Sequence, residues 1–237
     1  MTNRSNGLWQ MLAGAAIALA LAFMAINIKS GMLQFRDADR VVSVKGLAER
    51  TVEADLALWP INFSVVGSGL DKLQADIEAQ QSLIRSFLLL KGFAEGDIQL
   101  SMPKITDQHA NVYGSALPPD RYRAEVTVLV RTQEVERVKS GMQAVGELVK
   151  SGVALTQSYE FQPRFVFTKL ESIKPEMIAD ATRDARAAAD QFARDAEASV
   201  GSIRRASQGY FSIEDVDPFT PEIKRVRVVT SIDYILR

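Results

Sequence analysis

The sequence RYRAEVTVLVR at residues 121–131 carries the clearest structural signal in the chain. Apolar side chains occupy alternate positions, and polar or charged side chains fill most of the positions between them. A period of two is that of a β-strand, and such a division is typical of an antiparallel sheet with one packed face. The apolar face comprises Tyr122, Ala124, Val126, Val128 and Val130.

The apolar periodicity on either side of this strand predicts further strands and helices. Helices are expected at residues 68–91, between Thr132 and Gly152, and at residues 172–200. Strands are expected at residues 41–44, 51–66, 98–105, 159–167, 203–213 and 224–236, with a long loop at 106–120. Runs of strands broken by single helices predict an α+β fold, a mixed and largely antiparallel sheet with helices packed on it.

Two local patterns refine the segment around residues 51–71. Apolar side chains fall on even positions as far as Leu58 and on odd positions from Trp59, and Pro60 stands at this change of phase. A β-bulge at Pro60 is therefore expected, because one extra residue turns the following side chains to the other face. Ser68 and Asp71 predict a capping box at the start of the next helix.

Two more patterns predict how the C-terminal half is buried. Tyr159, Phe161, Phe165 and Phe167 share one face of their expected strand, and this aromatic stripe is interpreted as core. The long helix that follows has Pro175 in its expected first turn. Its expected buried stripe is Ile178, Ala181, Ala185, Ala188, Phe192 and Ala196.

The N-terminal segment Ser5–Ile28 contains no charged side chain and is mostly apolar. As one helix it is long enough to cross a hydrocarbon core of about 30 Å. Two interpretations remain, an uncleaved anchor and a cleaved signal peptide, and the apolar run past Ala20 favours the anchor. Residues 1–29 are thus a predicted inner-membrane anchor, 30–40 a linker and 41–237 a domain on the periplasmic side.

The composition of the 237-residue chain excludes several kinds of site. It contains no cysteine, so it has no disulfide, thiolate nucleophile or cysteine-ligated metal. The formal net charge of −1 gives no strong field to attract nucleic acid, and no nucleic-acid partner is expected.

Four features were weighed as sites of chemistry, and each has a more ordinary structural explanation. His109, the one histidine, is expected to be a solvated loop residue rather than a base or metal ligand. Glu214, Asp215 and Asp217 form an acidic cluster that lacks the spacing of a calcium loop. Residues 67–69, Gly-Ser-Gly, lack the lysine of a phosphate-binding loop, and the aromatic stripe with Arg164 could stack bases but is expected to be core.

The acceptor pattern Asn62-Phe63-Ser64 matches a glycosylation site but lies inside an expected strand, where modification is not expected. No catalytic, cofactor-binding or metal-binding residue is therefore assigned, and no cofactor is expected.

Several short motifs together resemble the SIMPL domain family. The matching segments are Val44-Lys45-Gly46 followed by residues 52–57, Gly92-Phe93 with residues 97–101, Tyr122-Arg123-Ala124, and the alanine-rich residues 184–189. The chain departs from the family pattern at Ala48, where a second glycine is usual, and at Ala54, where a proline is usual. The resemblance implies a bacterial envelope protein that self-associates and is associated with stress tolerance, and it carries no catalytic residues.

These observations lead to one main hypothesis and two alternatives. The main hypothesis is a membrane-anchored, periplasm-facing protein that is not an enzyme and works by self-association, as a homo-oligomer, or by partner binding. The first alternative is a hydrolase of envelope polymers that uses a pair of carboxylates in a cleft. The second is a small-ligand binding module, which an apolar pocket with a few polar groups would favour.

Overall fold

The computed structural model describes Met24, residues 40–110 and residues 117–237. Except for Met24, the predicted anchor Ser5–Ile28 lies outside the described residues, as do the linker up to residue 39 and residues 111–116 of the long loop. Within the described part of the chain, no helix combines the length and the apolar character needed to span a membrane.

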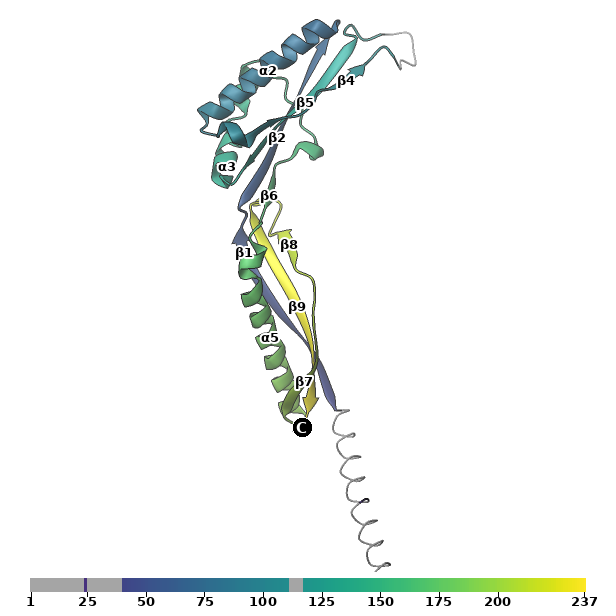
Figure 1. The fold of residues 1–237 in the computed structure, drawn as a ribbon, viewed down its shortest axis with the longest axis vertical. Helices are drawn as coiled ribbons and strands as arrows, with labels where there is room; N and C mark the ends of the chain where they lie inside the picture. Colours follow the sequence, from purple (N-terminus) through teal and green to yellow (C-terminus); the bar gives the residue numbers. More distant parts are fainter. Residues whose placement is uncertain (1–23, 25–39, 111–116) are drawn as a thin grey trace, which may run out of the picture. The chain divides into compact units, whose positions relative to one another are not determined.

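The chain forms two compact units, each assembled from separate stretches of sequence (Figure 1). The first unit contains the described residues up to Glu49 together with Lys174–Phe211 and Arg227–Arg237. The second unit contains Arg50–Ile173 and Ser212–Val226. The strands accordingly form two sheets rather than the single sheet that was expected.

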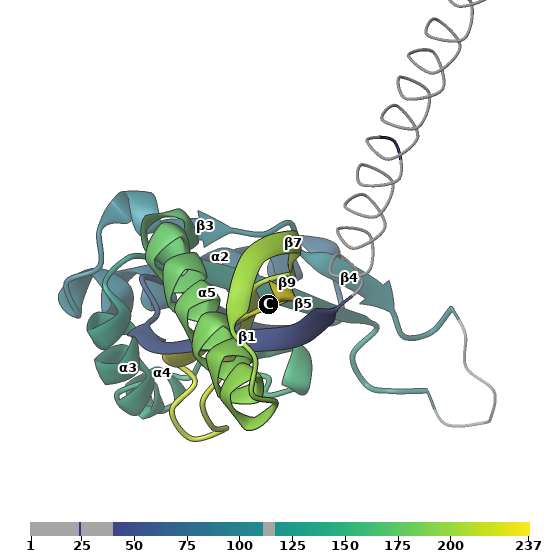
Figure 2. The same ribbon diagram turned by 90° about the horizontal axis from the view of Figure 1, so that it is seen from below.

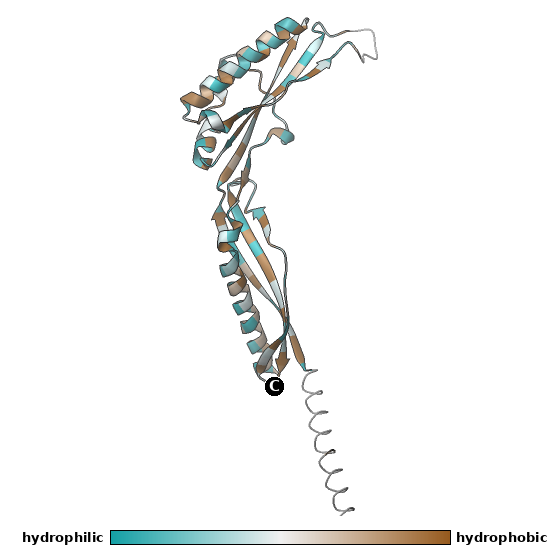
Figure 3. Ribbon diagram, in the orientation of Figure 1, coloured by the Kyte–Doolittle hydropathy of each residue, from teal (hydrophilic) through white to brown (hydrophobic). Residues whose placement is uncertain are grey.

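The sheet that makes up most of the first unit is built on the strand order β1-β9-β7. Strand β8, whose residues belong to the second unit, also pairs with β9, and the first residues of β9 belong to the second unit as well. These strands are β1 (Val41–Glu53), β7 (Val200–Gln208), β8 (Ser212–Asp215) and β9 (Ile223–Leu236). Helix α5 (Leu170–Asp195) covers one face of this sheet (Figures 1 and 2). Hydrophobic and hydrophilic bands alternate along β9 (Figure 3), and its apolar side chains Ile232 and Tyr234 join Val44, Ala185 and Ala189 in a small core.

Helix α5 approaches β1 closely because both surfaces carry small residues. A Cβ atom added at Gly46 would overlap the carbonyl oxygen of Ala181 and lie 2.5 Å from the backbone nitrogen of Ala185. At the same place the Asp184 carboxylate accepts a hydrogen bond from the backbone N–H of Leu47, at 2.9 Å. The first strand was expected only at residues 41–44, but β1 continues to Glu53, so Gly46 lies within the strand, where it permits the helix contact.

The buried stripe of α5 differs in part from the expected one. The buried residues follow a strict four-residue spacing, and Phe192 is 60% exposed. Alanine at successive i+4 positions lets the helix lie flat against the sheet, whereas Phe192 would hold it away. The observed stripe is Met177, Ala181, Ala185, Ala189 and Ala193.

The sheet of the second unit has the order β3-β5-β2-β6, with β4 also paired to β5. Its strands are β2 (Leu56–Gly67), β3 (Ile98–Leu100), β4 (Lys104–Asp107), β5 (Tyr122–Thr132) and β6 (Arg164–Val166), and all the pairings are antiparallel. The helices are α2 (Leu70–Leu90), α3 (Val135–Gln143), α4 (Gly146–Lys150) and the 3₁₀ turns η1 (Glu95–Asp97) and η2 (Tyr159–Phe161). Together they bury one large core.

The strongest sequence patterns are confirmed in this unit. Along β5, Ala124, Val126, Val128 and Val130 are buried while the alternate positions are more exposed. Helix α2 lies within the range expected for it, buries an apolar stripe and ends before Gly92, which adopts a positive φ of 86°. The buried stripe is Leu73, Ile77, Ile84, Phe87 and Leu88.

The predicted bulge at Pro60 is wrong. The pairing of β2 with β5 runs without a shift through Pro60, which lies opposite Leu129. The change of phase arises because the segment is two strands, with β1 ending at Glu53 and β2 beginning at Leu56. Asp55 fixes the junction, since its carboxylate accepts hydrogen bonds from the backbone N–H of Thr168 (2.7 Å) and from its hydroxyl (3.1 Å).

Three other local predictions are also wrong. Gly69, not Ser68, is the N-cap of α2, and no side chain caps this helix end. The helix expected between Thr132 and Gly152 is divided into α3 and α4 at Ala144–Val145. The single strand expected at residues 98–105 is β3 and β4, separated at Ser101–Pro103.

An ion pair links α3 to the segment that precedes β9. The Nζ atom of Lys139 lies 2.6 Å from Oε1 of Glu222, whose side chain is largely buried. The hydrogen bond from Lys139 lowers the pKa of the Glu222 carboxyl, and the same contact raises the pKa of Lys139. The carbonyl of Glu222 also accepts the N–H of Ala54 at 2.8 Å, so this residue joins three parts of the second unit.

Replacing Glu222 by Gln is expected to lower the free energy of unfolding by about 1 kcal/mol at pH 7. Because folding lowers the pKa of Glu222, its ionised form stabilises the fold above the ordinary carboxyl pKa, and this contribution disappears on acidification through the lowered value. The wild-type and Glu222→Gln denaturation midpoints should therefore converge once the pH falls below the lowered pKa of Glu222. Glu160→Gln, on exposed η2, is the charge-matched control, and a gap that persists at acid pH would contradict the assignment.

Replacing Gly46 by Ala is expected to destabilise the first unit by about 3 kcal/mol, because the new methyl group must displace α5. Chemical denaturation followed by circular dichroism measures the change. Gly69→Ala is the matched control, since a Cβ at that extended position would meet nothing within 4 Å. Equal stability of the two variants would show that α5 does not depend on this close approach.

Candidate functional site

A pocket of about 470 Å³ opens beside β2 in the second unit. It lies where the chain between Leu155 and β6 leaves the edge of β2 and forms an arch, here defined as residues 156–163. Each residue that lines the pocket is either apolar or polar without a charge. It consists of Trp59, Pro60, Ile61, Asn62, Met142, Val145, Leu155, Thr156, Gln157, Ser158, Phe161, Gln162 and Pro163.

The pocket exists because the arch is longer than the strand it spans. Phe63 pairs with Leu155 at one end and Leu58 pairs with Arg164 at the other. Between these pairs β2 contributes the four residues 59–62, whereas the facing segment of the same chain contributes residues 156–163. The extra residues of the arch cannot follow the strand, so they turn outwards through η2 and leave a space.

Pro60 prevents the arch from closing onto the strand. The carbonyl of Asn62 accepts the N–H of Thr156 (2.8 Å), and the N–H of Ser64 donates to Ala154 (3.0 Å). Even-numbered residues of β2 therefore direct their backbone groups to the arch edge, and the alternation places Pro60 on the same edge. Proline has no N–H to donate there, so this position cannot complete a regular ladder.

Asn62 brings an unusual polar group to the pocket. The residue is 4% exposed, and its Nδ2 donates to the hydroxyl of Thr127 on β5 at 2.9 Å. Its Oδ1 atom is not accessible to solvent and has no hydrogen-bond partner among the described residues. A buried acceptor without a donor costs about 1–3 kcal/mol, so this side chain is a local cost to the stability of the fold.

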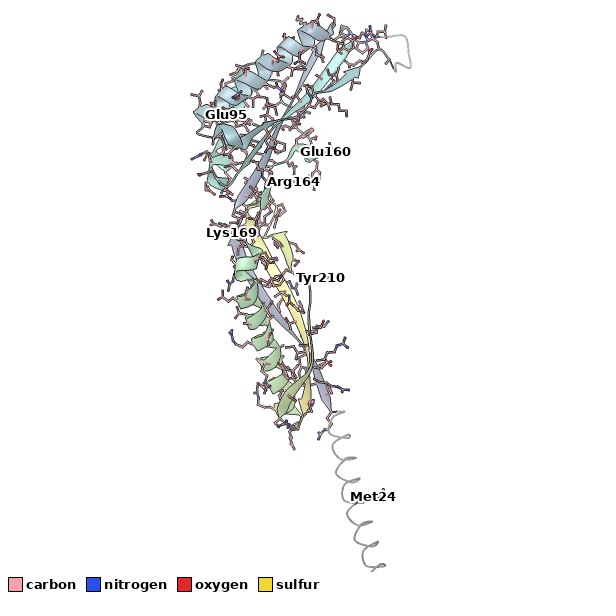
Figure 4. All side chains as sticks on the ribbon, viewed as in Figure 1. Met24, Glu95, Glu160, Arg164, Lys169 and Tyr210 are labelled. Carbon is pink, nitrogen blue, oxygen red and sulfur yellow. The ribbon has the colours of Figure 1, made fainter. Side chains whose placement is uncertain are left out.

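The outer face of the arch differs from the face that lines the pocket. Tyr159 is 86% exposed, and the charged residues Glu160 and Arg164 lie on η2 and β6 (Figure 4) without lining the pocket. Phe161 faces the pocket, and its N–H donates to the carbonyl of Ser158 at 3.1 Å. The predicted aromatic stripe is therefore wrong for Tyr159, because the chain turns through η2, and right for buried Phe165.

His109 lies away from the pocket and closes a loop of the second unit. Its Nε2 atom lies 2.9 Å from the carbonyl oxygen of Pro118, and its backbone N–H donates to Asp107. Asp107 also forms an ion pair with Arg121, and the hydrogen bond from Arg121 lowers the pKa of that carboxyl. This geometry gives His109 a structural role.

The acidic side chains of the predicted cluster at residues 214–217 contact different partners. Asp215 pairs with Lys224, while Asp217 accepts hydrogen bonds from residues that follow it in its own loop. Among the described residues, no group of three or more histidine or acidic side chains is placed to hold a metal ion.

The structure also places the Gly-Ser-Gly segment at residues 67–69 and the glycosylation pattern at Asn62. Gly67 ends β2, and Gly69 begins α2 with an ordinary extended backbone. Asn62 is buried within a strand, as expected when the glycosylation pattern was set aside.

Sequence reasoning missed the pocket itself. The available signal was Pro60 inside a strand, which was interpreted as a bulge, together with Pro163 in the facing segment. Each of these prolines removes an N–H donor from one of two facing segments. Such a pair is consistent with a gap between the segments as well as with a bulge in one of them.

The comparison with protein families gives one result. The model described as SIMPL, protein of unknown function (DUF541), matches residues 42–229. No curated protein matches the chain. The matched region covers both units and most of the sequence, and it includes β2, β5 and the arch that form the pocket. The chain therefore belongs to the SIMPL (DUF541) family.

Proposed function

We propose that this SIMPL protein is held in the inner membrane by its N-terminal segment, faces the periplasm, and acts by binding rather than by catalysis. Self-association or contact with another envelope protein is the proposed mode of action, with a role in envelope or oxidative stress tolerance. The apolar, uncharged segment Ser5–Ile28 supports the anchor. The observation that carries the binding function is the loop around Phe219.

Phe219 is presented to solvent by a loop that is already ordered. Its side chain is 93% exposed. The carboxylate of Asp217 accepts hydrogen bonds from the N–H groups of Phe219 (2.7 Å) and Thr220 (2.9 Å) and from the Thr220 hydroxyl (2.6 Å). The hydroxyl bond is the main cause of the lowered pKa of Asp217, so this carboxyl stays ionised at lower pH than an ordinary aspartate.

This arrangement suits a protein contact. Pro218 and Pro221 flank the aromatic residue and restrict the backbone further. An exposed aromatic side chain on an ordered loop loses little conformational entropy when a partner buries it, and such side chains dominate the energy of many interfaces.

A small-ligand binding module is the second candidate, and the pocket beside β2 favours it. A half-open space of about 470 Å³ with apolar walls and a few polar groups is typical of ligand sites. The hydrolase alternative gains no such support, since the residues lining this pocket include no carboxylate.

The localisation is tested by fractionation of cells that produce the full-length chain. The protein is expected in the membrane fraction, released by detergent and retained in high salt or carbonate, because an apolar helix leaves the bilayer only when the bilayer is dissolved. Protease added to spheroplasts should remove the body. Full-length protein in the cytosolic fraction would exclude the proposal.

Phe219→Ala is expected to weaken self-association by about 2 kcal/mol, or roughly 30-fold in the dissociation constant. Light scattering of the detergent-solubilised full-length chain over a concentration series, with chemical cross-linking in native membranes, measures it. Phe192→Ala on α5 is the control, because that side chain is also exposed but lies outside the loop. A wild-type chain that stays monomeric and forms no cross-linked species with any protein would refute the binding function.

A further inference from the structure

The second unit carries two surfaces that suit each other, the exposed side chain of Phe219 and the pocket beside β2. The loop of Phe219 belongs to Ser212–Val226 and the pocket to Arg50–Ile173, and both stretches form this unit. The inference that follows rests on the proposed function, self-association through the Phe219 loop, and names the surface that receives that loop.

Phe219 is the exposed aromatic side chain that gains most from burial. Three other aromatic side chains of the described residues are more than half exposed: Tyr159, Phe192 and Tyr210. The two tyrosines have a hydroxyl group that water can bind, and Phe192 is 60% exposed against 93% for Phe219. The side chain of Phe219 has no polar atom, and it lies in the uncharged segment Pro-Phe-Thr-Pro at residues 218–221. A partner that buries it removes apolar surface from water without replacing any hydrogen bond of that side chain.

The loop cannot fold back over Phe219 without losing contacts that fix both of its ends. At one end the carboxylate of Asp217 accepts the N–H of Phe219 at 2.7 Å. At the other end Glu222 forms its ion pair with Lys139, and its carbonyl accepts the N–H of Ala54. A surface that covers Phe219 therefore comes from another molecule.

The pocket beside β2 offers apolar surface that solvent still reaches. Its volume is about 470 Å³. An engineered cavity of about 150 Å³ is enough to bind benzene, so a phenyl ring and a neighbouring proline have room here. Several apolar lining residues are only half-buried, and a group that covered them would remove more apolar area from water. These residues are Pro60, Met142, Val145, Leu155, Phe161 and Pro163.

The two surfaces also match in charge. Residues 218–221 have no ionisable side chain, and neither have the residues that line the pocket. A charged partner would lose its hydration in this pocket without gaining an opposite charge, whereas an uncharged loop avoids that cost. Grooves that receive proline-rich segments are commonly lined by aromatic side chains, and this lining includes Trp59 and Phe161.

We propose that two copies of this chain associate by insertion of Phe219 of one copy into the pocket beside β2 of the other. The phenyl ring packs against the half-buried apolar residues of the lining, and the prolines on either side of it lie at the rim. Each copy has both surfaces, so a reciprocal exchange about a two-fold axis makes the contact twice.

Mixing two variants that each lack one surface tests this contact. Phe219→Ala removes the inserted group, and Val145→Asp places a carboxylate in the receiving pocket. Each variant alone is expected to self-associate about 30-fold more weakly than the wild type. A mixture of the two detergent-solubilised full-length chains, carrying different tags, is expected to co-purify, because one variant keeps the pocket and the other keeps the loop.

Val149→Asp is the matched control for the pocket variant. Val149 is exposed on α4 and lies outside the lining, so this variant should associate as the wild type does. Circular dichroism checks that both aspartate variants are folded. Self-association that survives Val145→Asp, or a mixture whose two chains do not co-purify, would overturn the proposal. If Val145→Asp does not fold, the cross-linking experiment decides alone.

Photochemical cross-linking from position 219 locates the receiving surface without altering the pocket. p-Benzoylphenylalanine replaces Phe219 in a detergent-solubilised mixture of isotope-labelled and unlabelled full-length chains, and mass spectrometry identifies the joined peptides. Cross-links between labelled and unlabelled chains are expected to end at residues 59–62, 142–145 or 156–163. Cross-links that end at another surface of the second copy would overturn the pocket assignment and leave self-association through the loop intact. Absence of any cross-link between copies would overturn both.

Discussion

The antiparallel pairing of β2 with β5 is the constraint on which the second unit depends. It is continuous from Ala57 opposite Thr132 to Gly67 opposite Tyr122. Because this register is unbroken, it directs one set of side chains to the core and leaves the other face to a mixture of polar and apolar residues, among them the paired Pro60 and Leu129. The outer edge of β5 carries β3 and β4, and the outer edge of β2 carries β6 and the arch. The pocket forms at the outer edge of β2, because the arch turns away from this edge instead of pairing along it.

The elements with the most regular apolar periodicity could be predicted from the sequence. Strand β5 and helix α2 are confirmed almost residue by residue, since a period of two or of about 3.6 over ten or more positions has one structural explanation. The ends of the helices and strands were harder to predict from the sequence. The junction at Asp55 depends on hydrogen bonds to Thr168, more than a hundred positions away, and no local pattern encodes such a contact. The division into two units has the same origin, because each unit combines distant segments.

The candidate pocket was not predictable, although some of its residues had been noticed. A pocket of this kind arises from a mismatch in length between two paired segments, and the pairing partner of β2 at residues 155–166 was not known in advance. Pro60 was noticed, but it was wrongly interpreted as a bulge in its own strand. The disturbance affects the neighbouring segment, however, and leaves β2 itself regular. Glycosylation of Asn62 was not expected because the residue lies inside an expected strand, and in the structure the residue is buried with an unpaired side-chain oxygen.

The hydrogen bond from Leu47 to Asp184 bears on how copies of this protein could meet. Within the described sheet, β1 is a terminal strand, and one of its outward N–H groups is already taken by a carboxylate from α5. A further strand could join that edge only by expelling a charged group, which protects against open-ended sheet extension. This protection applies to the β1 edge alone, and the other terminal strand on the path of this sheet is β7.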